Sequence, residues 1–201
     1  MPFPKFFDAA PRITVRDPLA RFLGVADGGV IEYGYADVVK LAGHSCPTVA
    51  SAYLMTRAAL SWLYPKALPE RGGIRVELRE DRLEGATGVV ANVASFLTGA
   101  TGDTGFKGIG GHFDRRNLLF FGVNIHGQLR FTRTDTGAAV TVSARLDSVP
   151  ADPRMVPLLQ RCLAGAATAE EATRFQSLWQ GRVSSLLVEH ADDPDVIVVQ
   201  H

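Results

Sequence analysis

This chain of 201 residues has few cysteines, no excess of charge of either sign and no long apolar run. The chain has two cysteines, too few for a disulfide framework, and lacks a Cys-x-x-Cys pair, so a reducing compartment is expected. Basic and acidic residues number 21 each, and this balance favours neither a nucleic-acid partner nor an anionic membrane surface. No stretch approaches the ~18 apolar residues of a membrane span, and the N-terminus lacks a signal-peptide run. We therefore predict a cytoplasmic protein with no nucleic-acid and no membrane partner.

The remaining composition is that of an ordinary globular protein, with 46% hydrophobic and 21% charged residues. Apolar residues at helical spacing predict helices over 17–24, 48–63, 88–97, 154–164 and 170–188. Strands are predicted over 30–33, 117–123, 128–132, 139–146 and 196–199, with turns at 124–127 and 134–137. Alternation over 74–79 predicts a half-buried strand with one solvated face. These elements predict an α+β fold in which an antiparallel sheet packs against helices.

A change of composition divides the chain near residue 147. Residues 147–153 are rich in aspartate and proline and are interpreted as a linker. Residues 1–147 are the predicted α+β core. Residues 148–201 are a mainly helical C-terminal extension, packed on that core or in a dimer interface, and a homodimer is expected.

The segment Gly43-His44-Ser45-Cys46-Pro47 is the strongest candidate for chemistry. Proline suits the first position of a helix, so Cys46 is predicted at a helix N-terminus. The partial positive charge there favours a thiolate, which is both the nucleophilic and the metal-binding form of cysteine. His44 adds an imidazole nitrogen, and the pair could offer two ligands to zinc. Alternatively, Cys46 is a small buried hydrophobic residue and His44 a hydrogen-bonded loop histidine.

A glycine-rich loop over 98–112 contains six glycines and is the second candidate. Its hydroxyls and charges predict a substrate-binding role for Thr98, Thr101, Asp103 and Lys107, with the loop folded over the His44/Cys46 site as a lid or wall. His112, at the end of the loop, is the predicted third metal ligand. The alternatives are a plain flexible loop and a solvent-exposed His112.

Arginines 115 and 116 follow this loop directly. The pair is interpreted either as a clamp on an anionic substrate or as solvent-exposed residues at the start of a strand.

The segments Ala42-Gly43-His44-Ser45-Cys46-Pro47 and Leu97-Thr98-Gly99-Ala100-Thr101-Gly102 resemble those of the FmdE family, which takes its name from a component of formylmethanofuran dehydrogenase. Family members carry His-Gly-His-x-Cys-Pro-Gly and Thr-Gly-Cys-Thr-x-Gly-Lys-Gly segments. The resemblance spans roughly residues 30–135 and implies an FmdE-like α+β core with a metal near the His-x-Cys pair.

The chain departs from the family pattern at three positions of these segments. Ala42 stands in place of the first histidine, Thr48 in place of the glycine and Ala100 in place of the second cysteine, whereas Lys107-Gly108 matches. The cysteine-rich C-terminal zinc finger of many members is absent.

Together these features predict a metal-binding FmdE-like protein that holds zinc, or alternatively nickel or iron, through His44, Cys46 and His112. A small-molecule substrate is compatible with this prediction, but no catalytic residue is assigned, and the sequence does not decide whether the protein is an enzyme. One alternative is a metal-free enzyme with Cys46 as nucleophile and His44 as base. Another is a non-catalytic accessory or metal-carrier subunit of a redox complex.

Overall fold

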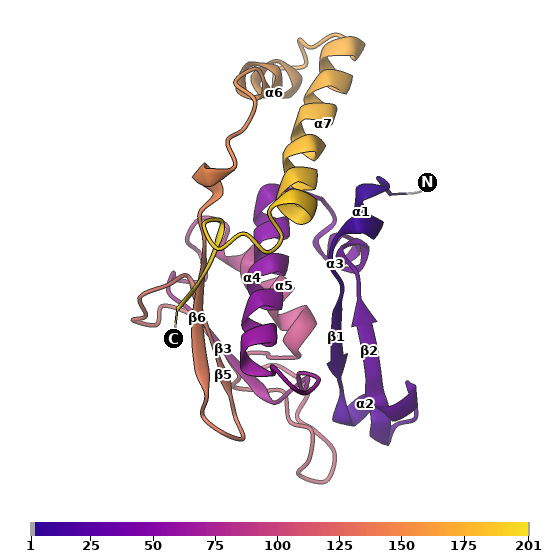
Figure 1. The fold of residues 1–201 in the computed structure, drawn as a ribbon, viewed down its shortest axis with the longest axis vertical. Helices are drawn as coiled ribbons and strands as arrows, with labels where there is room; N and C mark the ends of the chain where they lie inside the picture. The colour runs from indigo at the N-terminus through magenta and orange to yellow at the C-terminus, as the bar shows by residue number, and fades with distance from the viewer. Residues whose placement is uncertain (1–2, 201) are drawn as a thin grey trace.

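The computed structural model describes residues 3–200 and has an α+β fold (Figure 1). Its main sheet has the order β4-β3-β5-β6-β7, in which β3 and β4 are parallel and the other neighbours antiparallel. The strands of this sheet are β3 (Ile74–Leu78), β4 (Leu119–Phe120), β5 (Leu129–Arg133), β6 (Ala139–Ala144) and β7 (Ile197–Gln200). The predicted fold class, a sheet packed with helices, is confirmed.

Three layers organise the body of the molecule (Figure 1). Helices α4 (Pro47–Leu63) and α5 (Thr87–Thr98) lie between the main sheet and an antiparallel ribbon of β1 (Ile13–Arg16) and β2 (Val30–Tyr33). The shorter elements around the ribbon and the sheet are α1 (Phe6–Ala9), α2 (Pro18–Phe22), α3 (Tyr35–Ala42) and the 3₁₀ turns η1 (Asp27–Gly29) and η2 (Leu146–Ser148). Strand β1 was not predicted.

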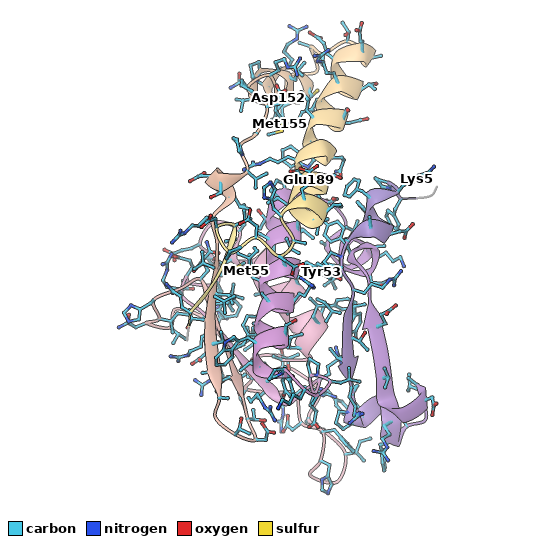
Figure 2. All side chains as sticks on the ribbon, viewed as in Figure 1. Lys5, Tyr53, Met55, Asp152, Met155 and Glu189 are labelled. Atoms are coloured by element: carbon cyan, nitrogen blue, oxygen red, sulfur yellow. The ribbon has the colours of Figure 1, made fainter. Side chains whose placement is uncertain are left out.

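Helix α4 is apolar on nearly all sides, which is the pattern of a helix buried all round. Figure 2 shows Tyr53 and Met55 on opposite sides of it. The Tyr53 hydroxyl donates to the carbonyls of Pro11 and Tyr33, at 2.6 and 3.2 Å, and so ties the helix to the ribbon. Burial raises the pKa of Tyr53, so this donor keeps its proton. Met55 lies on the sheet side.

The C-terminal segment leaves the body and then returns to it. Helices α6 (Met155–Leu163) and α7 (Ala169–Ser184) form a hairpin that projects from one end of the molecule (Figure 1). A π-helical segment, η3 (Ser185–Glu189), follows, and β7 then pairs with β6 as an edge strand of the main sheet. The predicted extension over 148–201 therefore contributes a strand to the core. None of the helices within residues 3–200 is long and apolar enough to cross a bilayer.

The predicted strand over 117–123 is largely wrong. Only Leu119 and Phe120 form a strand, β4, and it runs parallel to β3 instead of forming a hairpin with β5. Gly122 has a φ of 65°, a left-handed conformation that ends the extended run, and its N–H donates to the carbonyl of Glu80. The chain therefore turns across the end of β3.

A buried ion cluster joins the ribbon side to the loop before β4. Asp17 is the N-cap of α2, and its side chain is 5% exposed. Its carboxylate accepts from Arg115 at 2.7 Å and from Arg71 at 2.9 Å, in addition to two backbone N–H groups. Burial alone would raise the pKa of Asp17, but the hydrogen bonds and charges of the two arginines outweigh burial and hold that pKa below its usual value.

Replacement of Asp17 by asparagine should lower the free energy of unfolding by about 3 kcal/mol or more, because two largely buried guanidinium groups lose their counter-charge. Urea denaturation at pH 7 measures this loss. Because the folded-state pKa is depressed, the contribution of Asp17 is present above about pH 4 and is lost as the pH falls through the folded-state value. The exposed pair of Glu32 and Arg12, whose side chains are 52% and 51% exposed, gives the control, and Glu32→Gln should cost less than about 1 kcal/mol. Equal losses in the two variants would contradict the assignment.

Candidate functional site

The Gly-His-Ser-Cys-Pro segment forms the junction between α3 and α4. Gly43 ends α3 in the left-handed conformation, with φ 73°, and Pro47 is the first residue of α4. Cys46 is the N-cap of α4 and is 9% exposed. Its Sγ accepts a hydrogen bond from the N–H of Val49 at 3.4 Å. The predicted position of Cys46 at a helix N-terminus is therefore found in the structure.

His44 lies exposed on the same junction. Its Nδ1 is 2.9 Å from the carbonyl oxygen of Ala42. Because a carbonyl only accepts, Nδ1 is the donor in this contact, and in the neutral ring the lone pair is then on Nε2. A backbone carbonyl that fixes the tautomer in this way is typical of metal-binding histidines. His44 borders an apolar hollow with Phe7, Phe175 and Trp179.

Ser45 connects the junction to the C-terminal helix α7. Its carbonyl accepts from Trp179 Nε1 at 2.9 Å and from Gln180 Nε2 at 3.2 Å, and its hydroxyl donates to Gln180 Oε1 at 3.0 Å. The Tyr35 hydroxyl lies 3.1 Å from the same serine oxygen. No local sequence pattern indicated that Trp179 would bond to a residue 134 positions away.

The structure does not bring His112 to the His44/Cys46 pair. The ring of His112 contacts Phe113, whose own ring lies 5.3 Å from that of Phe22 in α2. Figure 1 places α2 at the end of the ribbon opposite to α3. Within residues 3–200, no three His, Cys, Asp or Glu side chains form a group that could hold a metal ion. The predicted ligand set of His44, Cys46 and His112 is therefore not assembled.

The glycine-rich loop does not cover the motif either. Thr98 is buried, and its hydroxyl donates to Ala94 O at 2.7 Å, while Thr101 donates to Arg115 O at 2.5 Å. These bonds tie the start of the loop to α5 and to the segment before β4. Asp103 and Lys107 are exposed. Of the four predicted substrate-binding residues, Thr101 borders a hollow, which lies beside α5 and apart from Cys46.

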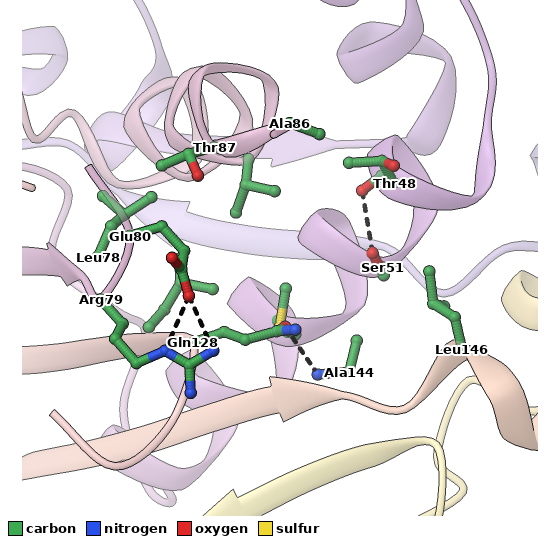
Figure 3. A pocket seen from close by; sticks show the side chains of 13 residues that line it. Thr48, Ser51, Leu78, Arg79, Glu80, Ala86, Thr87, Gln128, Ala144 and Leu146 are labelled. Carbon is green, nitrogen blue, oxygen red and sulfur yellow. Dashed lines mark hydrogen bonds and ion pairs between the residues drawn. The ribbon is translucent and has the colours of Figure 1, made fainter. Parts of the chain in front are cut away.

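A cavity of about 230 Å³ lies between α4, α5 and the main sheet (Figure 3). Its wall begins at Thr48, two residues after Cys46, and continues to Ser51 one turn later. Across from them, Ala86 and Thr87 form the start of α5. The N-termini of two neighbouring helices therefore border one cavity. The apolar part of the lining comes from Met55, Leu78, Val90, Leu129 and Leu146.

Six of the thirteen residues that line the cavity are polar, namely Thr48, Ser51, Arg79, Glu80, Thr87 and Gln128, and some of them are held by hydrogen bonds. Gln128 accepts from the N–H of Ala144 at 3.0 Å through Oε1, which sets the orientation of its amide. Arg79 and Glu80 form an ion pair of 2.9 Å, so the two charges in the lining balance each other. The sequence indicated none of these residues as site residues, because Gln128 lies in a predicted strand and Thr87 directly before a predicted helix, with no motif around either.

No protein-family model matches this chain, and no curated protein matches it in sequence. The relation to the FmdE family therefore stays a prediction from the two segments.

The role of Cys46 as a helix cap can be separated from any role in chemistry. Cys46→Ser keeps an acceptor for the N–H of Val49 and should leave the free energy of unfolding within about 0.5 kcal/mol of wild type. Cys46→Ala removes the acceptor and should cost about 1 kcal/mol. Urea denaturation of both variants measures the difference. If serine destabilises as much as alanine, the cap does not explain the residue.

Proposed function

We propose that the protein binds a small organic molecule in the cavity between α4, α5 and the main sheet. The observation that carries this proposal is the convergence of two helix N-termini on one largely apolar cavity. Several first-turn N–H groups are already bonded, among them those of Val49, Thr87 and Val89. The partial positive charge of the two helix ends remains, and it favours an oxygen atom that carries negative charge or partial charge. The ligand is therefore a molecule with an apolar body and a carbonyl or carboxylate head.

The size of the cavity limits the ligand. An apolar cavity of about 150 Å³ can hold benzene, whereas pockets for drug-sized molecules begin near 300 Å³. The 230 Å³ found here suits a molecule slightly larger than benzene. The side chains of Met55, Leu129 and Val90 would contact its body.

The hydroxyls of Thr48 and Thr87 are the groups assigned to the head of the ligand. Both residues belong to the first turns of their helices, and Figure 3 shows both at the cavity. The resemblance to the FmdE family supports a site here, because the cavity wall continues directly from the Gly-His-x-Cys-Pro segment.

Isovalerate and its neutral isostere isovaleramide are suitable probes, since both have a branched apolar body and a carbonyl oxygen. Titration calorimetry should detect binding of both to the wild-type protein. Thr87→Val preserves the shape of the side chain but removes its hydroxyl, so affinity should fall about tenfold, the equivalent of one hydrogen bond of ~1.4 kcal/mol.

Ala86→Phe supplies the blocking control. Ala86 is exposed at the edge of the cavity, so a phenyl group there should abolish binding without loss of a core residue. Leu83→Phe adds the same ring three residues earlier, at a site that is 90% exposed and outside the cavity, and should bind like wild type. Binding that survives Ala86→Phe would place the ligand elsewhere.

A second proposal, divalent metal binding at His44 and Cys46, is favoured by the contact between His44 Nδ1 and Ala42 O. That contact directs the Nε2 lone pair away from the backbone, and Cys46 lies two residues further on. Zinc takes four ligands, so two from this pair would leave the remaining positions to water, the organic ligand or a second copy of the chain.

Elemental analysis of freshly purified protein tests the metal proposal. Wild type should contain zinc, nickel or iron, and His44→Gln should lose it. Cys46→Ser should lose the metal as well. This variant is the decisive one, because serine preserves the helix cap and removes the sulfur ligand. Equal metal content in all three proteins, or none in wild type even after addition of zinc, would contradict the proposal.

A further inference from the structure

A second polar site lies on the other side of α5, around the buried cluster of Asp17. Arg71 and Arg115 share this one carboxylate, so the three side chains carry a net charge of +1. Asp17 is saturated, because it also accepts the N–H groups of Leu19 and Ala20. Glu70, the other carboxylate whose charge acts on Arg115, is exposed to solvent and therefore screened. The buried positive charge is not balanced within the cluster.

Arg115 is the unusual member of the cluster. Its side chain is 6% exposed, and its Nη1 is buried without a hydrogen-bond partner within the described chain. Buried guanidinium donors are normally paired, because an unpaired one loses its bonds to water and gains nothing in return. Nη1 lies against Gly72 and Gly99, where a Cβ atom would approach it to 1.9 and 2.8 Å. The two glycines therefore make room for the arginine.

A hollow of about 360 Å³ adjoins this cluster, and Arg71, Arg115 and Gly99 all border it. Asn92 and Ser95, on one face of α5, add an amide and a hydroxyl to its wall. Arg71 is held toward α5 by two bonds to the carbonyl of Phe96, at 3.0 and 3.3 Å, yet 23% of its side chain stays exposed. The polar wall is therefore fixed and reachable.

The remaining wall of the hollow is apolar. Leu41 and Phe106 are 46% and 44% exposed, and both border the hollow. A ligand with an apolar ring would cover these side chains and remove them from water.

We propose that this hollow binds a small organic monoanion, such as an aromatic or branched carboxylate. Its charge would balance the net +1 of the cluster, and Arg71, Asn92 and Ser95 would donate to its oxygens. Arg115 adds its charge at the wall of the hollow, although its buried Nη1 lies against Gly72 and Gly99 and is not assigned to the ligand. Inorganic phosphate, about half of which is dianionic near pH 7, would exceed the charge available in that form and has no apolar body to cover Leu41 and Phe106. This site is separate from the α4–α5 cavity and does not depend on it.

Benzoate, benzamide and inorganic phosphate test the proposal by titration calorimetry on the full chain. Benzoate should bind at least tenfold more tightly than benzamide, its neutral isostere, and more tightly than phosphate. Arg71→Gln should weaken benzoate binding at least tenfold. Arg116→Gln is the matched control, because Arg116 is an exposed neighbour that pairs with Asp114 outside the hollow, and it should bind benzoate like wild type.

Two blocking variants separate this site from the cavity. Asn92→Trp, at an exposed position on the wall of the hollow, should abolish benzoate binding, whereas Ala86→Phe, which closes the cavity, should leave it intact. The opposite pattern would assign benzoate to the cavity and overturn the proposal. Equal affinity for benzoate and benzamide, stronger binding of phosphate, or no effect of Arg71→Gln would overturn it as well.

Discussion

The burial of helix α4 between the main sheet and the β1–β2 ribbon is the constraint on which the rest of the structure depends. One side of the helix contacts the ribbon through Tyr53, whose hydroxyl bridges two backbone carbonyls, and the other side faces the sheet through Met55. These contacts on both sides fix the position of α4 and therefore the position of its N-terminus. That N-terminus carries Cys46 and begins the cavity wall at Thr48.

Helix α5 runs beside α4 and separates two sites of different chemistry. Toward α4 and the sheet, its first residues border a cavity whose only charges pair with each other. Its opposite side, together with the start of the glycine-rich loop, borders a hollow with an excess positive charge. A neutral or charged carbonyl compound suits the first site, whereas the second requires an anion. The α6–α7 hairpin also constrains the segment that precedes α4, because Trp179 and Gln180 donate hydrogen bonds to the Ser45 carbonyl.

Local signals predicted much of this fold. Pro47 after Cys46 correctly indicated the start of α4, because the preference of proline for the first helical turn needs no distant contact. The alternation of apolar and charged residues over 74–79 correctly predicted strand β3, but it did not predict that Glu77 would be buried. Its predicted solvated face includes Glu77, whose side chain is 3% exposed and accepts two bonds from Arg130 in β5. The sequence alone could not identify Glu77 and Arg130 as partners, because their contact depends on the pairing of β3 with β5.

The contacts between residues far apart in the sequence were the least predictable features. Asp17 and Arg115 are 98 positions apart, and Ser45 and Trp179 are 134 apart, so no spacing rule connects them. Arg115 was interpreted as a clamp or an exposed residue, and its burial depends on two glycines, Gly72 and Gly99, contributed by separate segments. His112 matched the chemistry of a zinc ligand, but the loop that carries it lies beside α2 and Phe22.

The most direct test of the central claim is a ¹H–¹⁵N NMR titration of the wild-type protein with isovaleramide. A ligand in the α4–α5 cavity should shift the amide signals of Thr48, Ser51 and Thr87 together, with one common affinity, because these residues of two helices border the same space. The amides of α7 and of the loop near Phe106 should not move. Shifts confined to those regions, or none at Thr48 and Thr87 at saturating ligand, would contradict the assignment of the cavity as a binding site.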